Sequence, residues 1–176
     1  MAHHSYVDES IRGNNYYLAE VVISPKDVGW VRSNISRKFR VNGRLLHMHQ
    51  ESMATRSRAL FELMKIPFAV NIIRCDKTSS TLLARQASIH ELAASQSMQS
   101  CKLLILEQIS SNLFDRRILE AYARDPFTTF PEFRHMRCSE EPLLTIPDVM
   151  AWSFGRGGVW RSRVDSKVLN YTEISS

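Results

Sequence analysis

Two short segments of the chain are almost continuously apolar, and this pattern predicts buried strands. Residues 16–23 are rich in aromatic and β-branched side chains, and residues 68–75 repeat the pattern. Segments of this length are typical of strands that are covered on both faces. A further strand is predicted over residues 3–9. Because turn residues at 13–15 join it to the strand over 16–23, the two are expected to form an antiparallel hairpin.

Apolar residues recur at helical spacing in most of the other segments. A helix is predicted to begin at Ser24-Pro25 and to end at Asn42-Gly43. The pattern predicts further helices over 52–65, 81–109, 117–124 and 147–154, and short strands over 112–115 and 133–138. Because strands and helices alternate, the fold class is α/β, with a mixed β-sheet flanked by helices. No internal boundary is evident, so residues 1–176 are expected to form a single domain, with residues 164–176 as a peripheral tail.

Composition adds an expectation about partners and compartment. The chain of 176 residues carries a net charge of +5, and 17 of its 23 cationic side chains are arginines, which bind carboxylate and phosphate groups through two nitrogens at once. An anionic partner is therefore expected. The three scattered cysteines form no disulfide or zinc pattern, which favours a reducing, cytoplasmic location. No apolar run approaches 18 residues, so no membrane association is expected.

Three aspartates stand at the ends of predicted elements. Asp8 ends the first strand, where a carboxylate can point into a cleft or remain a solvated charge that begins a turn. Asp115 can cap the helix that follows it. Asp148 lies three residues after Thr145 in a sequence typical of a capping box, and it gains from the helix dipole. From spacing alone, structural and functional interpretations of all three stay open.

The densest group of potential metal ligands is the segment from His47 to Glu51. If this segment is extended, positions 47, 49 and 51 share one face. A zinc site needs a fourth, distant ligand, and the chain has no cysteine or histidine at a suitable spacing. The sequence therefore argues against zinc.

Four short motifs occur in order along the chain. They are Asp8-Glu9-Ser10 before the apolar residues 17–23, then Leu45-Leu46-His47, then Asp115-Arg116-Arg117, and finally Ser139-Glu140 followed by residues 144–151. In this order they resemble the motifs D-E-S-G, E-x-H, D-x-R and S-K…L-Q-L-A-D of a bacterial and phage family. That family is the domain of unknown function numbered thirty-eight hundred. The resemblance covers residues 5 to about 160.

This resemblance implies an RNase H-like fold and a function. Asp8, Asp115 and Asp148 would converge at one rim of the sheet, with their carboxylates within about 8 Å of one another, as catalytic residues and ligands of Mg²⁺ or Mn²⁺. Glu9, Glu51 and His47 are further candidate metal ligands. The candidates for holding the phosphate backbone of a nucleic acid are Arg116, Arg117, Arg134, Arg137 and Arg156. Solvation or pairing with carboxylates explains these arginines equally well.

The sequence departs from the family motifs at several positions. Ile11 stands where the family has Gly, Leu45 where it has the Glu of E-x-H, Thr145 where it has Gln and Pro147 where it has Ala. The missing Glu leaves two hypotheses from different classes. The first is a metal-dependent nuclease that hydrolyses phosphodiester bonds. The second is a catalytically weakened or inactive RNase H-like domain that binds nucleic acid or a protein partner. A third hypothesis, a pure oligomerisation module, has only the methionine and aromatic content in its favour, and a homo-oligomer is compatible with the first two as well.

Overall fold

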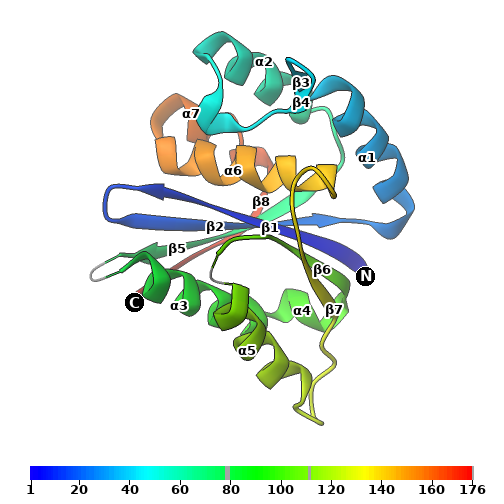
Figure 1. The fold of residues 1–176 in the computed structure, drawn as a ribbon, viewed down its shortest axis with the longest axis vertical. Coiled ribbons are helices and arrows are strands. Elements are labelled where there is room, and N and C mark those ends of the chain that lie inside the picture. Colours follow the sequence, from blue (N-terminus) through cyan, green and yellow to red (C-terminus); the bar gives the residue numbers. More distant parts are fainter. Residues whose placement is uncertain (78–79, 111, 176) are drawn as a thin grey trace.

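The fold is built on one mixed sheet, seen nearly edge-on in the computed structural model of Figure 1. The structure describes residues 1–77, 80–110 and 112–175. The main sheet has the order β7-β6-β1-β2-β5-β8. Its strands are β1 (His3–Arg12), β2 (Asn15–Ile23), β5 (Ala69–Asp76), β6 (Cys101–Glu107), β7 (Glu132–Met136) and β8 (Val168–Ser175). β2 runs antiparallel to both of its neighbours, β1 and β5, and the other pairs are parallel.

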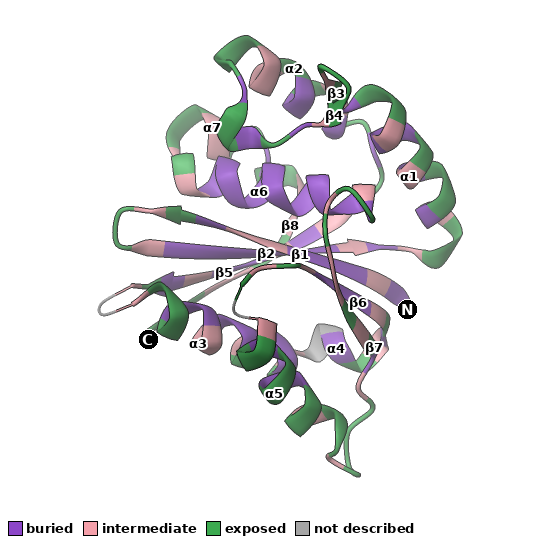
Figure 2. Cartoon of the chain, in the orientation of Figure 1, coloured by how far each residue is buried: buried purple, intermediate pink, exposed green. Residues whose placement is uncertain are grey.

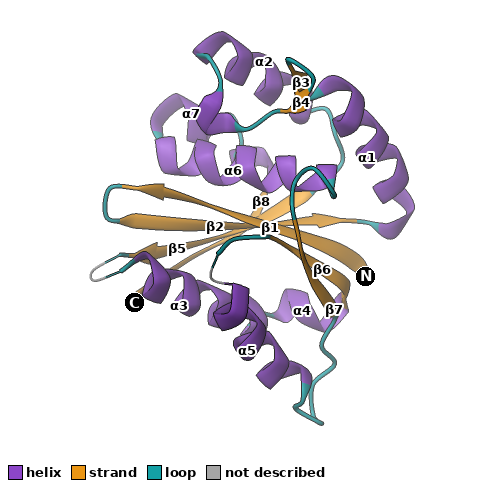
Figure 3. Ribbon diagram, in the orientation of Figure 1, coloured by secondary structure: helices purple, strands orange, loops and turns teal. Residues whose placement is uncertain are grey.

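Helices cover both faces of this sheet (Figure 3). One face carries α1 (Pro25–Lys38), α2 (Met53–Leu63), α6 (Thr145–Arg156) and α7 (Gly158–Ser162), and the other carries α3 (Thr81–Ala94), α4 (Gln96–Ser100) and α5 (Asn112–Ala123). The described residues also include three short 3₁₀ turns: η1 (Met48–Gln50), η2 (Pro142–Leu144) and η3 (Asp165–Lys167). The predicted α/β class with a mixed sheet flanked by helices is confirmed.

The alternation of side chains along β1 determines which face each site residue occupies. Tyr6 belongs to the core beneath α6, whereas Val7 belongs to the core beneath α3 and α5. Because successive side chains of a strand point to opposite faces, Asp8 continues the Tyr6 side and Glu9 continues the Val7 side. The two neighbouring acids are therefore directed to different faces of the sheet.

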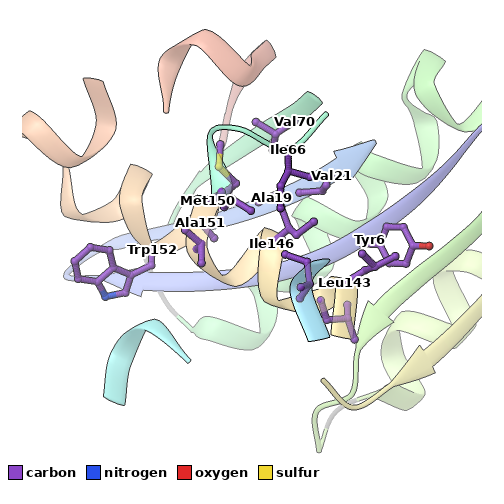
Figure 4. Close-up of a cluster of buried hydrophobic side chains, with 14 of the residues drawn as sticks. Tyr6, Ala19, Val21, Ile66, Val70, Leu143, Ile146, Met150, Ala151 and Trp152 are labelled. Carbon is purple, nitrogen blue, oxygen red and sulfur yellow. The ribbon is translucent and has the colours of Figure 1, made fainter. Parts of the chain in front are cut away.

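Helix α6 is the most deeply buried element of the chain. Every residue from Thr145 to Phe154 is buried, because α6 lies between the sheet and helices α1 and α2 (Figure 2). Figure 4 shows Ile146, Met150 and Ala151 of α6 packed against Ala19 and Val21 of β2. A helix that is covered on all sides is apolar on all sides, so the single acid in this segment is conspicuous.

The hairpin of residues 3–23 is confirmed, with residue pairs from His4↔Ile23 to Arg12↔Asn15. The predicted end of the first helix was wrong. α1 ends at Lys38, and Asn42-Gly43 forms the turn between two short strands, β3 (Arg40–Val41) and β4 (Arg44–Leu45). Both turn residues have positive φ angles, 51° at Asn42 and 80° at Gly43. Two-residue loops that connect the strands of a hairpin adopt this conformation, and it favours the sequence Asn-Gly.

The prediction of one long helix over 81–109 was also wrong. The segment divides into α3, α4 and the central strand β6. A short apolar run such as that of β6 has no periodicity that separates a strand from a buried helix. Pairing with β1 and β7 decides the outcome. The predicted strand over 112–115 lies instead in the first turn of α5.

The C-terminal segment is part of the main sheet. Residues 164–176 were expected to be a peripheral tail, but β8 pairs in parallel with β5 as the outermost strand, from Val70↔Val168 to Asp76↔Ser175. The three cysteines are free thiols. Among the described residues, no helix is long and apolar enough to cross a membrane.

Candidate active site

A cavity of about 950 Å³ opens where the carboxyl ends of β1 and β6 meet the start of α6. Four acids line it: Asp8, Glu9, Glu107 and Asp148. The β3–β4 hairpin and the η1 turn contribute the basic side chains of Arg40, Arg44, His47 and His49. The cavity therefore presents carboxylates from the sheet and α6, arginines from the hairpin, and imidazole groups from the segment that contains η1.

Strand register places two of the acids next to each other. Val7 of β1 pairs with Leu106 of β6, and the next residues along these parallel strands are Asp8 and Glu107. Neighbouring strands lie about 4.8 Å apart. Tyr6 and Ile105, two residues earlier in each strand, belong to the same core, so Asp8 and Glu107 face the same side of the sheet. That side is the one covered by α6.

Asp148 reaches the cavity from the first turn of α6. The helix begins at Thr145 and no side chain caps it, so the predicted capping box is not formed. Instead, the Oδ2 atom of Asp148 accepts a hydrogen bond of 2.8 Å from the backbone N–H of Met48. The Nδ1 atom of His47 lies 3.6 Å from Oδ1 of the same carboxylate. The η1 turn thereby fixes the orientation of Asp148.

These acids have perturbed protonation equilibria. Burial raises the pKa of Glu107 to about 7, although the backbone N–H of Cys138 opposes the shift. Burial also raises the pKa of Asp8, and the charges of Glu9 and Asp148 raise it further. For Asp148, burial raises the pKa against the opposing effects of His47 and the Met48 N–H. Crowded, partly desolvated carboxylates of this kind are stabilised in their ionised form by a cation.

Asp115 lies elsewhere. It is buried at the start of α5, on the face of the sheet opposite Asp148, and it does not line the cavity. Arg85 of α3 donates to both of its carboxylate oxygens, at 3.1 Å from Nε to each and 2.7 Å from Nη2 to Oδ2. His135 Nε2 lies 3.2 Å from Oδ2. The structure therefore brings two of the three predicted aspartates to one cavity and places the third in a buried ion-pair network.

The three further candidate metal ligands, Glu9, Glu51 and His47, do not all lie at the cavity. Glu9 lines the cavity, but its carboxylate is bound by Nη1 of Arg85. Glu51 pairs with Arg44 at 2.8 Å and does not line the cavity. His47 lines the cavity beside Asp148.

The ion-pair network around Asp115 also sets its protonation. Burial alone would raise the pKa of Asp115, yet hydrogen bonds from His135 and Arg85 hold this pKa below its usual value.

None of the five predicted nucleic-acid-binding arginines lines the cavity. Arg134 pairs with Glu132 at 2.6 Å, and Arg117 lies over the ring of Phe114, with 6.0 Å between its Cζ and the ring centroid. Arg116, Arg137 and Arg156 are exposed. The cationic side chains at the cavity are instead Arg40 and Arg44, which sequence reasoning did not single out.

Sequence reasoning also missed Glu107, because the segment that carries it was assigned to a helix. A usable signal was present: the apolar run Leu103 to Leu106 ends in an acid, as the run before Asp76 does. Within the described residues, no group of three or more His, Cys, Asp or Glu side chains is gathered closely enough to hold a metal ion. The acids thus share a cavity without being assembled into a coordination sphere.

Comparison with known proteins establishes the class of fold. No known protein family and no curated protein sequence matches the chain. The structure is similar to RNase HII from Archaeoglobus fulgidus in its complex with PCNA, with a TM-score of 0.57 and 12% identity over 94% of this chain and 78% of that one. It also matches a mutant of Bst-RNase HIII, with a TM-score of 0.48 and 9% identity over 93% of this chain and 52% of that one. The chain has an RNase H-like fold, as the sequence motifs implied.

Proposed function

We propose that the protein is a metal-dependent nuclease that hydrolyses phosphodiester bonds, with Asp8, Glu107 and Asp148 as its candidate metal ligands. The observation that carries the proposal is the placement of Asp8 and Glu107. They are next to each other in register on two adjacent parallel strands, Asp8 within β1 and Glu107 at the end of β6, on the face that meets Asp148. Glu107 takes the place of Asp115 in this set.

The chemistry of these residues fits Mg²⁺ or Mn²⁺. Carboxylate oxygens are the hard donors that both ions prefer. The Oε2 atom of Glu107 is buried without a hydrogen-bond partner, and an unsatisfied buried oxygen is stabilised by a cation. Such an ion activates a water molecule and stabilises the leaving oxygen of a phosphodiester. Because the acids are not gathered at coordinating distance, ion binding requires their side chains to move toward one another.

The chain's own residues supply orientation and charge. The Met48 N–H holds Asp148 in place, and Arg85 holds Glu9 from the opposite face of the sheet. Arg40 and Arg44 also line the cavity; Arg44 is paired with Glu51, so Arg40 is the cationic group that would face an anionic substrate there. The partner expected for this arrangement is a nucleic acid.

The RNase H-like fold also supports the resemblance to the domain family of unknown function described above, and we include membership in that family in the proposal. The second hypothesis, a weakened or inactive domain that binds nucleic acid or a protein, retains one supporting observation. The four cavity acids are not assembled into a metal site among the residues that the structure describes.

Cleavage assays separate the two hypotheses. Labelled single- and double-stranded DNA and RNA are incubated with the protein in Mg²⁺, in Mn²⁺ and in a chelator. We expect cleavage only with a divalent ion, and its loss in Asp8→Asn and Glu107→Gln. The matched controls, Asp165→Asn and Glu120→Gln, change exposed acids away from the cavity and should retain activity. Activity that survives Glu107→Gln refutes the ligand assignment, and nucleic-acid binding without cleavage by the wild type supports the inactive domain.

A further inference from the structure

Two arginines from distant parts of the chain lie against the indole ring of Trp152, and a third, Arg156, follows Trp152 by one turn of α6. Arg12 ends β1, Arg56 lies in α2 and Arg156 ends α6. The Cζ atom of Arg12 lies 5.3 Å from the Trp152 ring centroid, and that of Arg56 lies 4.7 Å from it. Cation–π contacts of this kind hold the guanidinium groups against the ring.

The positive charge of this cluster has no counter-charge among the described residues. None of the three arginines forms an ion pair there, whereas Arg32 pairs with Glu141 at 2.7 Å and Arg85 with Asp115 at the same distance. The Nε atom of Arg12 is buried without a hydrogen-bond acceptor. Burial lowers the pKa of Arg12, and the charges of Arg156 and Arg56 lower it further. Like charges held together in this way favour the binding of an anion.

The cluster is continuous with the cavity. Arg56 donates from Nε to the carbonyl oxygen of Met48 at 2.7 Å and from Nη2 to that of His49 at 3.2 Å. These two residues belong to the η1 turn, and His49 lines the cavity. The cluster therefore adjoins the turn that forms one wall of the cavity.

Two independent backbone spans separate the arginines of the cluster from the residues that carry the carboxylates. Arg12 follows Asp8 by four residues of strand, about 13 Å at 3.3 Å per residue, on the same face of the sheet. Arg156 follows Asp148 by eight residues of helix, about 12 Å at 1.5 Å per residue. A single phosphate group cannot span such a distance. Along one strand of a duplex, with one charge every 3.4 Å of helix axis, it corresponds to about three or four phosphates.

We infer that Arg12, Arg56 and Arg156 form a phosphate-binding subsite for the backbone of a nucleic-acid strand, three or four phosphates away from the bond that lies at the carboxylates. The inference rests on the proposed function and narrows it, because it makes the substrate a polynucleotide and excludes a mononucleotide or small phosphoester. Trp152 is 2% exposed, so its ring supports the guanidinium groups and does not stack on a base. Contacts to phosphate alone carry no sequence preference.

Binding measured without catalysis tests the subsite. Fluorescence anisotropy of fluorescein-labelled 20-nucleotide DNA and RNA strands is recorded in a chelator, with Asp8→Asn as the parent protein. We expect Arg156→Ala to weaken binding of both strands by about tenfold at low salt, and to reduce the slope of log affinity against log salt by about one. The control is Arg58→Ala, because Arg58 is exposed on the same helix as Arg56 and points away from it. Arg58→Ala should leave affinity and slope unchanged.

Strand length provides a second measurement. Strands of 12 nucleotides should bind the parent protein more tightly than dinucleotides, and Arg156→Ala should remove most of this difference. Arg56→Lys keeps the charge but loses the planar fork of the guanidinium group. Its affinity for the strand should lie between that of the parent protein and that of Arg156→Ala. Thermal melting of each variant establishes that it is folded. Equal effects of Arg156→Ala and Arg58→Ala, or no effect of either, overturn the subsite.

The subsite and the proposed function can fail separately. If the wild type cleaves nothing but Arg156→Ala still weakens strand binding selectively, the nuclease proposal fails and the subsite stands. If the wild type cleaves dinucleotides as efficiently as long strands, and Arg156→Ala changes neither, the nuclease proposal stands and the subsite fails.

Discussion

Replacing Asp115 with Asn tests whether this residue belongs to the fold or to the reaction. The Asp115 side chain is 1% exposed and that of its partner Arg85 is 3% exposed. Arg85 makes hydrogen bonds of 2.7 and 3.1 Å to the carboxylate, and His135 lies 3.2 Å away from it. The substitution removes the negative charge and keeps the shape of the side chain.

The expected cost follows from this burial. Breaking a buried ion pair by neutralising one partner costs about 3–5 kcal/mol, because the remaining charge is left without compensation. Glu9 stays in contact with Arg85, and the Asn oxygen still accepts one hydrogen bond, so the lower end of about 3 kcal/mol is expected here. For a domain of this size each kcal/mol corresponds to about 2–4 °C, so the melting temperature should fall by about 6–12 °C.

Circular dichroism melting of Asp115→Asn at pH 7 measures this change, with Asp8→Asn as the matched control. Asp8 is crowded by Glu9 and Asp148, so neutralising it should leave the melting temperature unchanged or raise it. Cleavage measured well below both melting temperatures should be retained by Asp115→Asn and lost in Asp8→Asn. If Asp115→Asn melts like the wild type but is inactive, Asp115 is a catalytic residue and the assignment of Glu107 in its place is wrong.

Three further predictions concern the ion, pH and the edge strand. Mn²⁺ at about 100 times its dissociation constant should stabilise the wild type by about 2.7 kcal/mol in a thermal-shift assay, and Glu107→Gln should lose most of this gain. The pKa of Asp115 is held below 3.8, so its ion pairs stabilise the protein above that pH and lose this contribution as pH falls through the folded-state pKa. Acid titration of stability should consequently be steeper below pH 4 for the wild type than for Asp115→Asn. Truncation before Val168 removes β8 and the stacking of Tyr171 on Phe154, whose ring centroids are 5.9 Å apart, so it should lower the melting temperature and promote aggregation through the exposed edge of β5. An unchanged melting temperature and a monomeric product would show that β8 is dispensable.

The sequence by itself determined the elements whose pattern is local. The hairpin of β1 and β2, the strand β5 and the helices α1 and α2 follow from apolar runs, turn residues and helix starts that neighbouring residues specify. The sequence also placed Asp8 in the first strand, but at its end, whereas pairing with β2 extends β1 to Arg12. The RNase H-like class came from motifs in their order along the chain.

Tertiary structure decided the rest, because the deciding interactions join residues far apart in the chain. The run that became β6 is a strand because β1 and β7 supply its hydrogen bonds, and only that pairing places Glu107 beside Asp8. Asp115 and Asp148 both stand in the first turn of a helix. One lies opposite Arg85, 30 residues earlier, and the other lies opposite Met48, 100 residues earlier. Local spacing cannot distinguish the two, since the faces on which their helices pack determine which acid meets the cavity and which is held in an ion pair.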